Sequence, residues 1–211
     1  MSLHQRLWEQ HAELARDALN HRFVRGIGDG SLPLESFRAY VAQDAFFLES
    51  FARAYALALS RSADREGLYD FADLLAGVLE ELRLHEGYAE RWDVLLGEVV
   101  PDEATLAYTE FLLSTAALGT VGETCAAMTP CMRLYAFLGT CLEGEGYGEE
   151  SPYAEWIQTY ADPKFEELAD RLEALLDRYA DDTPAVRRAY GRAMRLEVGF
   201  FEAAARAGEE R

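Results

Sequence analysis

Cysteine and histidine are both scarce in this chain of 211 residues. The three cysteines, at positions 125, 131 and 141, form no CxxC pair. Neither a disulfide framework nor a zinc site is therefore predicted, and free thiols in a reducing compartment are expected. No stretch approaches the roughly 18 consecutive apolar residues of a membrane span. The charged N-terminal segment lacks the apolar core of a signal peptide, so we expect a cytoplasmic protein.

Basic residues are also few. Lysine and arginine total 20 against 38 acidic residues, which gives a formal charge of −18. A chain this acidic is a poor partner for nucleic acid or for an anionic membrane. The acidic residues recur at helical intervals, as in "EELADRLEALLDRYADD", which favours a solvated acidic surface over a cation site.

Strand patterns are absent, and helical periodicity dominates. Three glycines, an aspartate and a proline in "HRFVRGIGDGSLP" predict a shaped loop that ends at Ser31, the expected N-cap of the next helix. Long helices with short turns predict one all-α domain over residues 1–211, built as an antiparallel bundle. The predicted helices cover residues 2–19, 33–60, 64–96, 101–119, 123–142 and 151–160, and two more begin at "ADPKF" and "DDTP".

One carboxylate lies on an aromatic helical stripe. Tyr40, Asp44, Phe47 and Phe51 follow one another at i, i+4, i+7 and i+11, so they share a face. A carboxylate on an inward face is costly unless it is paired or hydrogen-bonded. Asp44 is therefore either satisfied by a neighbouring helix or loop, or ready to hydrogen-bond a nitrogen of a ligand. The pattern does not choose between these.

The last helix repeats this arrangement. Glu197 shares a face with Met194 and Phe201, beside Phe200. Burial would raise the pKa of its carboxyl, which suits a proton donor. The alternative is a glutamate at the edge of the core that pairs with an arginine.

A proline and a cysteine interrupt an apolar helix in "AAMTPCMRLY". Pro130 donates no backbone hydrogen bond and crowds the carbonyl of Ala126, so a bend is expected beside Cys131. Tyr135 lies one turn further along the same face. A single cysteine in a helix is usually a small buried hydrophobe, and the other two cysteines are assigned to that role. Only the proline and the tyrosine distinguish Cys131.

Several segments resemble the TenA, or thiaminase II, family. They are "HRFVRGIGDGSLPLESFRAYVAQDAFFL", "ELRLHE", "LAYTEFLL", "AAMTPCMRLYAFLG", "YAEWIQTYADPKF" and "RLEVGFFEAA", in family order and with family spacing. The resemblance implies a haem-oxygenase-like multi-helix bundle, commonly a homotetramer. It also implies a hydrolase of thiamin salvage, acting on amino-HMP (4-amino-5-aminomethyl-2-methylpyrimidine) or on thiamin to give hydroxymethylpyrimidine.

The resemblance assigns roles to single residues. It makes Cys131 a covalent nucleophile, and it makes Glu197 the group that handles protons at the ring and the leaving group. Asp44 matches the carboxylate that grips the pyrimidine, and Phe47 stands where many members carry tyrosine. The matching pocket tyrosines are Tyr108, Tyr135 and Tyr160. The partner is then a small aminopyrimidine or thiamin, and the chemistry requires no metal and no cofactor.

Three other readings stay open. The same bundle hosts haem oxygenases, for which His11 or His21 could be axial ligands, although a histidine at a helix end is more often solvated or a cap. It also hosts di-iron oxidases, for which Glu81 and His85 form the only helical Glu/His pair. Finally, Phe47 leaves room for a pyrimidine-binding or regulatory protein that has lost turnover.

Overall fold

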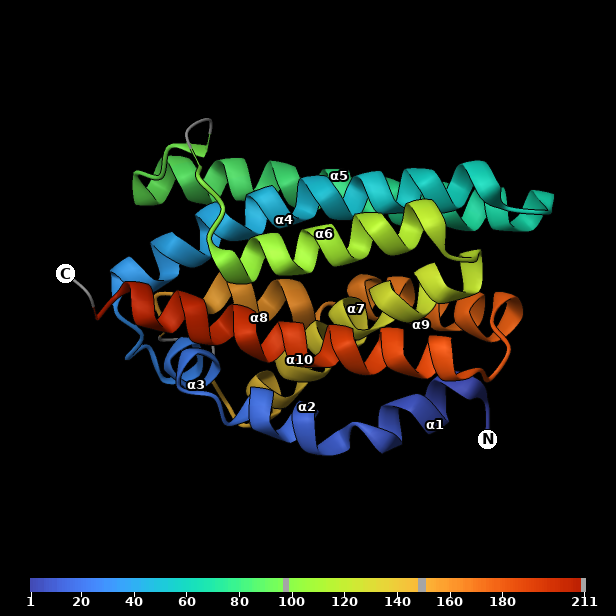
Figure 1. The fold of residues 1–211 in the computed structure, drawn as a ribbon. Helices are drawn as coiled ribbons and strands as arrows, with labels where there is room; N and C mark the ends of the chain where they lie inside the picture. Colours follow the sequence, from blue (N-terminus) through green and yellow to red (C-terminus); the bar gives the residue numbers. More distant parts are fainter. Residues whose placement is uncertain (97–98, 148–150, 210–211) are drawn as a thin grey trace.

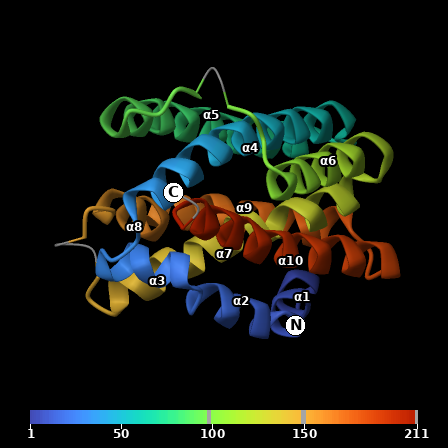
Figure 2. The ribbon, with the colours of Figure 1, turned by 60° about the vertical axis from the view of Figure 1, so that its left-hand side comes forward.

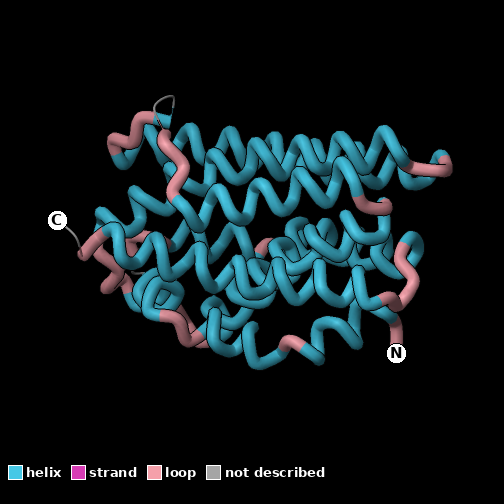
Figure 3. The backbone as a smooth tube through the Cα atoms, in the orientation of Figure 1, coloured by secondary structure: helices cyan, strands magenta, loops and turns pink. Residues whose placement is uncertain are grey.

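The computed structural model describes residues 1–96, 99–147 and 151–209, and in these residues it contains helices and no strand (Figure 3). The all-α prediction is confirmed. The helices are α1 (Leu3–Gln10), α2 (Ala12–Leu19), α3 (Arg22–Asp29), α4 (Leu34–Arg61), α5 (Arg65–Trp92), α6 (Glu103–Leu118), α7 (Val121–Gly144), α8 (Ala154–Ala161), α9 (Pro163–Tyr179) and α10 (Pro184–Ala207).

The helices form a layered bundle with α7 in its interior (Figures 1 and 2). Helix α4 packs against α5 and α6, while α7 packs against α8, α9 and α10. Helices α1 to α3 lie along the opposite side of the bundle from α5. Within the described residues, α7 alone is long and apolar enough to span a membrane. However, 72% of its most apolar window is buried inside the protein, so its apolar side chains form the centre of the core.

Side-chain caps start several helices whose starting regions the sequence predicts. A cap oxygen accepts a backbone N–H that the first helical turn leaves unpaired. Asp64, Asp102, Asp162 and Thr183 accept such N–H groups at the starts of α5, α6, α9 and α10. The first helical residue of both α9 and α10 is a proline, which needs no hydrogen-bond partner there.

The first predicted helix is divided in the structure. It breaks at His11, whose backbone leaves helical geometry (φ −115°). The ring Nδ1 of His11 lies 2.8 Å from the carbonyl oxygen of Leu7. The imidazole therefore hydrogen-bonds to the Leu7 carbonyl, which in an unbroken helix would accept the backbone N–H of residue 11.

The predicted loop over residues 21–33 is wrong in its first part, because Arg22–Asp29 form helix α3. Instead of forming a loop, Gly28 allows α3 to pack closely against Leu142, and Gly30 ends the helix. A Cβ on Gly28 would lie 3.0 Å from the side chain of Leu142, and Gly30 ends the helix in the left-handed region (φ 76°). Ser31 is not the N-cap of α4, because Pro33 occupies that position. The N–H of Ser31 instead donates to Asp29 Oδ1 at 2.9 Å.

Two helix ends also differ from the prediction. Helix α5 ends at Trp92 instead of 96, because Asp93 adopts a left-handed conformation (φ 55°). Helix α8 begins at Ala154, and Ser151 lies one turn before it. The Ser151 hydroxyl accepts the N–H of Tyr153 at 3.1 Å and donates to the carbonyl of Ile27 at 2.6 Å.

Candidate active site

The structure brings Asp44 of α4, Cys131 of α7 and Glu197 of α10 into one buried region. The Cys131 thiol contacts the Glu197 carboxyl, and burial, with the charge of Asp44, raises the pKa of both groups. Exposed fractions are 4% for Asp44, 8% for Cys131 and 1% for Glu197. One sulfur atom and two carboxyls from three separate helices therefore lie in one buried region.

Glu197 is held as a protonated acid near neutral pH. Burial raises the pKa of its carboxyl to about 8, although hydrogen bonds from Tyr108 and Cys131 oppose the shift. The Tyr108 hydroxyl donates to Glu197 Oε1 at 2.5 Å. Among the described residues Glu197 pairs with no arginine, so the reading as a core-edge ion pair is wrong. An acid that titrates near neutral pH can both give and take a proton.

Cys131 is a thiol, not a thiolate, in this structure. Burial raises its pKa well above the usual value, and the nearby carboxyls of Glu197, Glu81 and Asp44 raise it further. Nucleophilic attack therefore requires a neighbouring group that accepts the thiol proton.

Helix α7 is continuous through Pro130, and the Thr129 hydroxyl donates to the Cys125 carbonyl at 2.7 Å.

Asp44 is the anionic half of a buried ion pair. Its Oδ2 lies 2.6 Å from His85 Nε2, and the other ring nitrogen of His85 lies 3.1 Å from the carbonyl oxygen of Glu81. Burial alone would lower the pKa of His85, but the hydrogen bond and charge of Asp44 outweigh burial and raise it. Both ring nitrogens then donate, which fixes the imidazolium and, through it, the Asp44 carboxylate.

Aromatic rings enclose these polar groups. The ring of Phe47 lies 4.8 Å from that of Tyr108, and Tyr135 meets Tyr160 edge to face at 4.7 Å. All four residues are buried. Such walls suit a flat aromatic ligand, which stacks on ring faces while a few polar groups orient it.

Glu81 is a site residue that the sequence reasoning did not assign. Its Oε1 accepts the Tyr160 hydroxyl at 2.6 Å. Burial, with the charge of Asp44, raises the pKa of its carboxyl to about 7. A signal was available: Leu74, Val78, Glu81 and His85 repeat the i, i+4, i+7, i+11 spacing of the Asp44 stripe.

A glycine sets the distance between the helices that carry Cys131 and Tyr160. A Cβ on Gly139 of α7 would lie 2.5 Å from the carbonyl carbon of Tyr160. The backbone of α8 therefore rests directly on α7. This contact holds Tyr135 and Tyr160 at their edge-to-face distance.

Comparison with known proteins places this arrangement in a family. The model of the TENA/THI-4/PQQC family matches residues 8–207. The chain belongs to this family.

The chain is similar to an aminopyrimidine aminohydrolase of Halalkalibacterium halodurans, with 37% identity over 185 residues, which cover 85% of this chain and 83% of that protein. The bifunctional TH2 protein of Arabidopsis thaliana is 36% identical over 86% of this chain. The chain spans only 34% of that longer protein.

Solved TenA structures share the fold. A TenA homologue from P. horikoshii OT3 superposes with a TM-score of 0.90 at 25% identity, covering 98% of this chain and 100% of that one. A protein from Silicibacter sp. TM1040, described as a TenA family transcription regulator, gives 0.89 at 27% identity and covers 95% of each chain. The haem-oxygenase-like all-α architecture is thereby confirmed.

The histidines proposed as haem ligands serve helix ends in this TenA-family chain. His21 caps α3, accepting the N–H of Phe23, and also contacts Glu202. His11 binds the Leu7 carbonyl at the break between α1 and α2. In the described part of the chain, no three His, Cys, Asp or Glu side chains gather to hold a metal ion.

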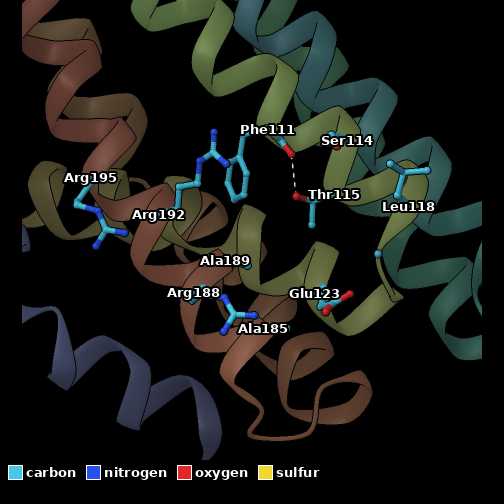
Figure 4. A pocket seen from close by; sticks show the side chains of 11 residues that line it. Phe111, Ser114, Thr115, Leu118, Glu123, Ala185, Arg188, Ala189, Arg192 and Arg195 are labelled. Atoms are coloured by element: carbon cyan, nitrogen blue, oxygen red, sulfur yellow. Dashed lines mark hydrogen bonds between the residues drawn. The ribbon is translucent and has the colours of Figure 1, made fainter.

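A separate surface groove of about 500 Å³ lies between α6, the start of α7 and α10 (Figure 4). Arg192 covers the ring of Phe111 at 4.6 Å there, and Arg188 and Arg195 also line the groove. None of the predicted site residues lines it, so it lies apart from the chemistry that this TenA-family site supports.

Proposed function

We propose that this chain is an aminopyrimidine aminohydrolase, or thiaminase II, that acts in thiamin salvage. It hydrolyses amino-HMP, and thiamin, to hydroxymethylpyrimidine. The observation that carries the proposal is the buried Cys131–Glu197 contact beside the Asp44–His85 ion pair. Relatives named aminopyrimidine aminohydrolase, 28% to 37% identical over most of the chain, support the same activity.

The Asp44 carboxylate and the surrounding aromatic rings orient the substrate. Asp44, held by His85, accepts hydrogen bonds from the amino group and ring nitrogen of the pyrimidine. Phe47, Tyr108, Tyr135 and Tyr160 surround the ring. A ring fixed in this way presents one face to the Cys131 sulfur.

The first chemical step is addition of the thiol to the protonated ring. Glu197 gives its proton to a ring nitrogen, which makes the ring electrophilic. The Cys131 sulfur then bonds to a ring carbon, and the thiol proton returns to the Glu197 carboxylate. The raised pKa values of both groups suit this exchange, because neither proton is lost to solvent beforehand.

The second step expels the leaving group from the methylene carbon. The electron pair of the adduct drives out the amine or the thiazole. Water then adds to the methylene carbon and gives up its surplus proton to solvent. The C–S bond breaks, Glu197 gives its proton to the sulfur and takes the proton of the ring nitrogen, and the aromatic ring is restored. This division of one hard displacement into addition and elimination is the advantage of covalent catalysis.

Replacement of the nucleophile tests the proposal. Ammonia release from amino-HMP should occur with wild type and fall by at least about 100-fold in Cys131→Ala. Cys141→Ala, a partly exposed cysteine on the same helix, is the matched control and should keep its activity. Equal rates for wild type and Cys131→Ala would remove Cys131 from the mechanism.

A pyrimidine-binding or regulatory protein is the second candidate. Phe47 favours it, because this position lacks a hydroxyl in the pocket, and one solved relative is described as a transcription regulator. Tight binding of hydroxymethylpyrimidine without turnover by wild type would support this candidate and contradict the first.

The assembly and location of the protein are part of the same proposal. A homotetramer is expected from the family resemblance, and the cytoplasm from the sequence. Light scattering of the purified protein measures the first, and fractionation of the source cells measures the second. A monomer, or protein recovered in the membrane fraction, would contradict them.

A further inference from the structure

The buried site has one carboxyl that also reaches an open pocket. A pocket of about 230 Å³, here named the outer pocket, lies between α5, α8 and α9 and includes Met132 of α7. Glu81 lines it, whereas Asp44, Cys131 and Glu197 do not. Glu81 is partly exposed, yet its carboxyl binds Tyr160, which is 4% exposed and belongs to the buried site. Glu81 therefore forms the wall between the site and the outer pocket.

The protonation of Glu81 decides what the Tyr160 hydroxyl can do. An ionised carboxylate only accepts hydrogen bonds, so the hydroxyl must then donate to Glu81. A protonated Glu81 can donate to the Tyr160 oxygen, which frees the phenolic hydrogen to point at a ligand. Both directions fit the observed 2.6 Å separation. The pair can therefore pass a proton from the outer pocket into the site.

The two leaving groups of the proposed reaction differ in their need for a proton. Thiazole departs from thiamin as a neutral molecule, because its nitrogen carries the positive charge before the bond breaks. A neutral amine departs from amino-HMP well only if its nitrogen gains a proton as the C–N bond breaks. The resemblance gives Glu197 the leaving group as well, but its contacts are to Cys131 and Tyr108, and the proton that it regains from the thiol serves the release of the sulfur. Tyr160, hydrogen-bonded to Glu81, can supply a second proton to the amine.

Building on the proposed function, we propose that Glu81 is a positioning residue that delivers this second proton through Tyr160. As the C–N bond breaks, its electron pair goes to nitrogen, which takes the Tyr160 hydroxyl proton. Glu81 passes its own proton to the Tyr160 oxygen and is left as a carboxylate. Water in the outer pocket restores the proton, and ammonia leaves on that side.

The surroundings of Glu81 suit a group that titrates near neutral pH. Burial and the Asp44 charge favour its protonated form, while His85 and the Tyr160 hydrogen bond favour ionisation. The balance places the pKa of the carboxyl at about 7. The titratable groups that interact with it are Asp44 and Tyr55 of α4, His85 of α5, Cys131 of α7 and Tyr160 of α8. Three charged residues also line the outer pocket with it: Glu80 of α5, Asp162 between α8 and α9, and Lys164 of α9.

The test compares two substrates in one variant. Glu81→Gln keeps a hydrogen-bond partner for Tyr160 but carries no transferable proton. We expect kcat for amino-HMP to fall by about 100-fold, with KM within about threefold, while kcat for thiamin stays within about threefold. The part of the pH profile that depends on a group near pH 7 should disappear for amino-HMP. Glu80→Gln, at the neighbouring acid of the outer pocket, is the control and should match wild type on both substrates.

A second variant keeps the test independent of folding. Tyr160→Phe should cause a similar loss on amino-HMP, and the double variant should lose no more than either single one, because both interrupt one proton path. Equal loss on both substrates, or no loss on amino-HMP, would overturn the inference while the proposed function stands. Wild-type protein inactive on both substrates would refute the proposed function, and this inference with it.

Discussion

Glu197→Gln should stabilise the folded protein, and the gain should grow with pH. In the unfolded chain the carboxyl has its ordinary pKa of 4.5, and in the folded protein burial raises this to about 8. The folded state thus retains a proton that the unfolded state loses as the pH rises above 4.5. Ionisation therefore favours unfolding, and stability falls with increasing pH until the folded carboxyl also ionises.

The structure sets the size of this effect. The two pKa values differ by 8 − 4.5 = 3.5, and each pKa unit corresponds to about 1.4 kcal/mol. The upper limit is therefore about 5 kcal/mol, reached above about pH 8 and absent near pH 4. Glutamine carries no charge and still offers an oxygen to the Tyr108 hydroxyl, so the variant escapes this cost.

Urea unfolding, followed by tryptophan fluorescence between about pH 5 and about pH 9, measures the difference in free energy of unfolding between variant and wild type. The general charge repulsion of this acidic protein cancels in that difference. Glu202→Gln is a control of opposite sign, because Arg206 holds the pKa of Glu202 below its usual value. Its loss of stability should be constant between about pH 5 and about pH 9 and should shrink only below about pH 4.5.

A constant difference between Glu197→Gln and wild type across this pH range would refute the reasoning. It would show that the folded state does not hold the carboxyl in its protonated form. The role of Glu197 as a proton donor to the ring would then lose its physical basis.

Two further predictions concern the neighbours of this carboxyl. His85→Ala should lower the free energy of unfolding by about 3–5 kcal/mol, since it leaves the Asp44 charge buried without its partner; a urea midpoint equal to wild type would contradict this. In wild type this contribution should be complete below about pH 6.5 and disappear as the pH rises through the raised pKa of His85. Phe47→Tyr should raise kcat/KM for amino-HMP by about 2-fold to 10-fold, which corresponds to one added hydrogen bond. The control Phe51→Tyr, one turn further along α4, should not raise it. Equal steady-state rates for Phe47→Tyr and wild type would contradict the idea that the pocket lacks a useful hydroxyl at position 47.

The sequence predicts those parts of the fold that depend on local chemistry. Helices α5, α6, α9 and α10 begin within a few residues of the predicted positions, because the aspartate and threonine caps that start them bond within their own first turns. Helix α3 is not predicted from the sequence, for the opposite reason. Gly28 looks like a loop residue until Leu142, more than a hundred residues away, is seen to lie against it.

The site shows the same division. The stripes that carry Asp44 and Glu197 are visible in the sequence, and both side chains are buried as predicted. Their partners come from other helices, so no spacing rule pairs Asp44 with His85 or Tyr108 with Glu197. The link between Glu81 and Tyr160 spans 79 residues and depends on how α5 meets α8.

Gly139 gives this pocket a vulnerable point outside its lining. The residue has no side chain and need never touch a substrate, yet one added methyl group would push against the main chain of Tyr160. Tyr160 would swing, and its link to Glu81 would stretch or break. A redesign of substrate preference that changed only the residues lining the pocket would leave out Gly139. A single methyl group at that position would nevertheless alter the pocket.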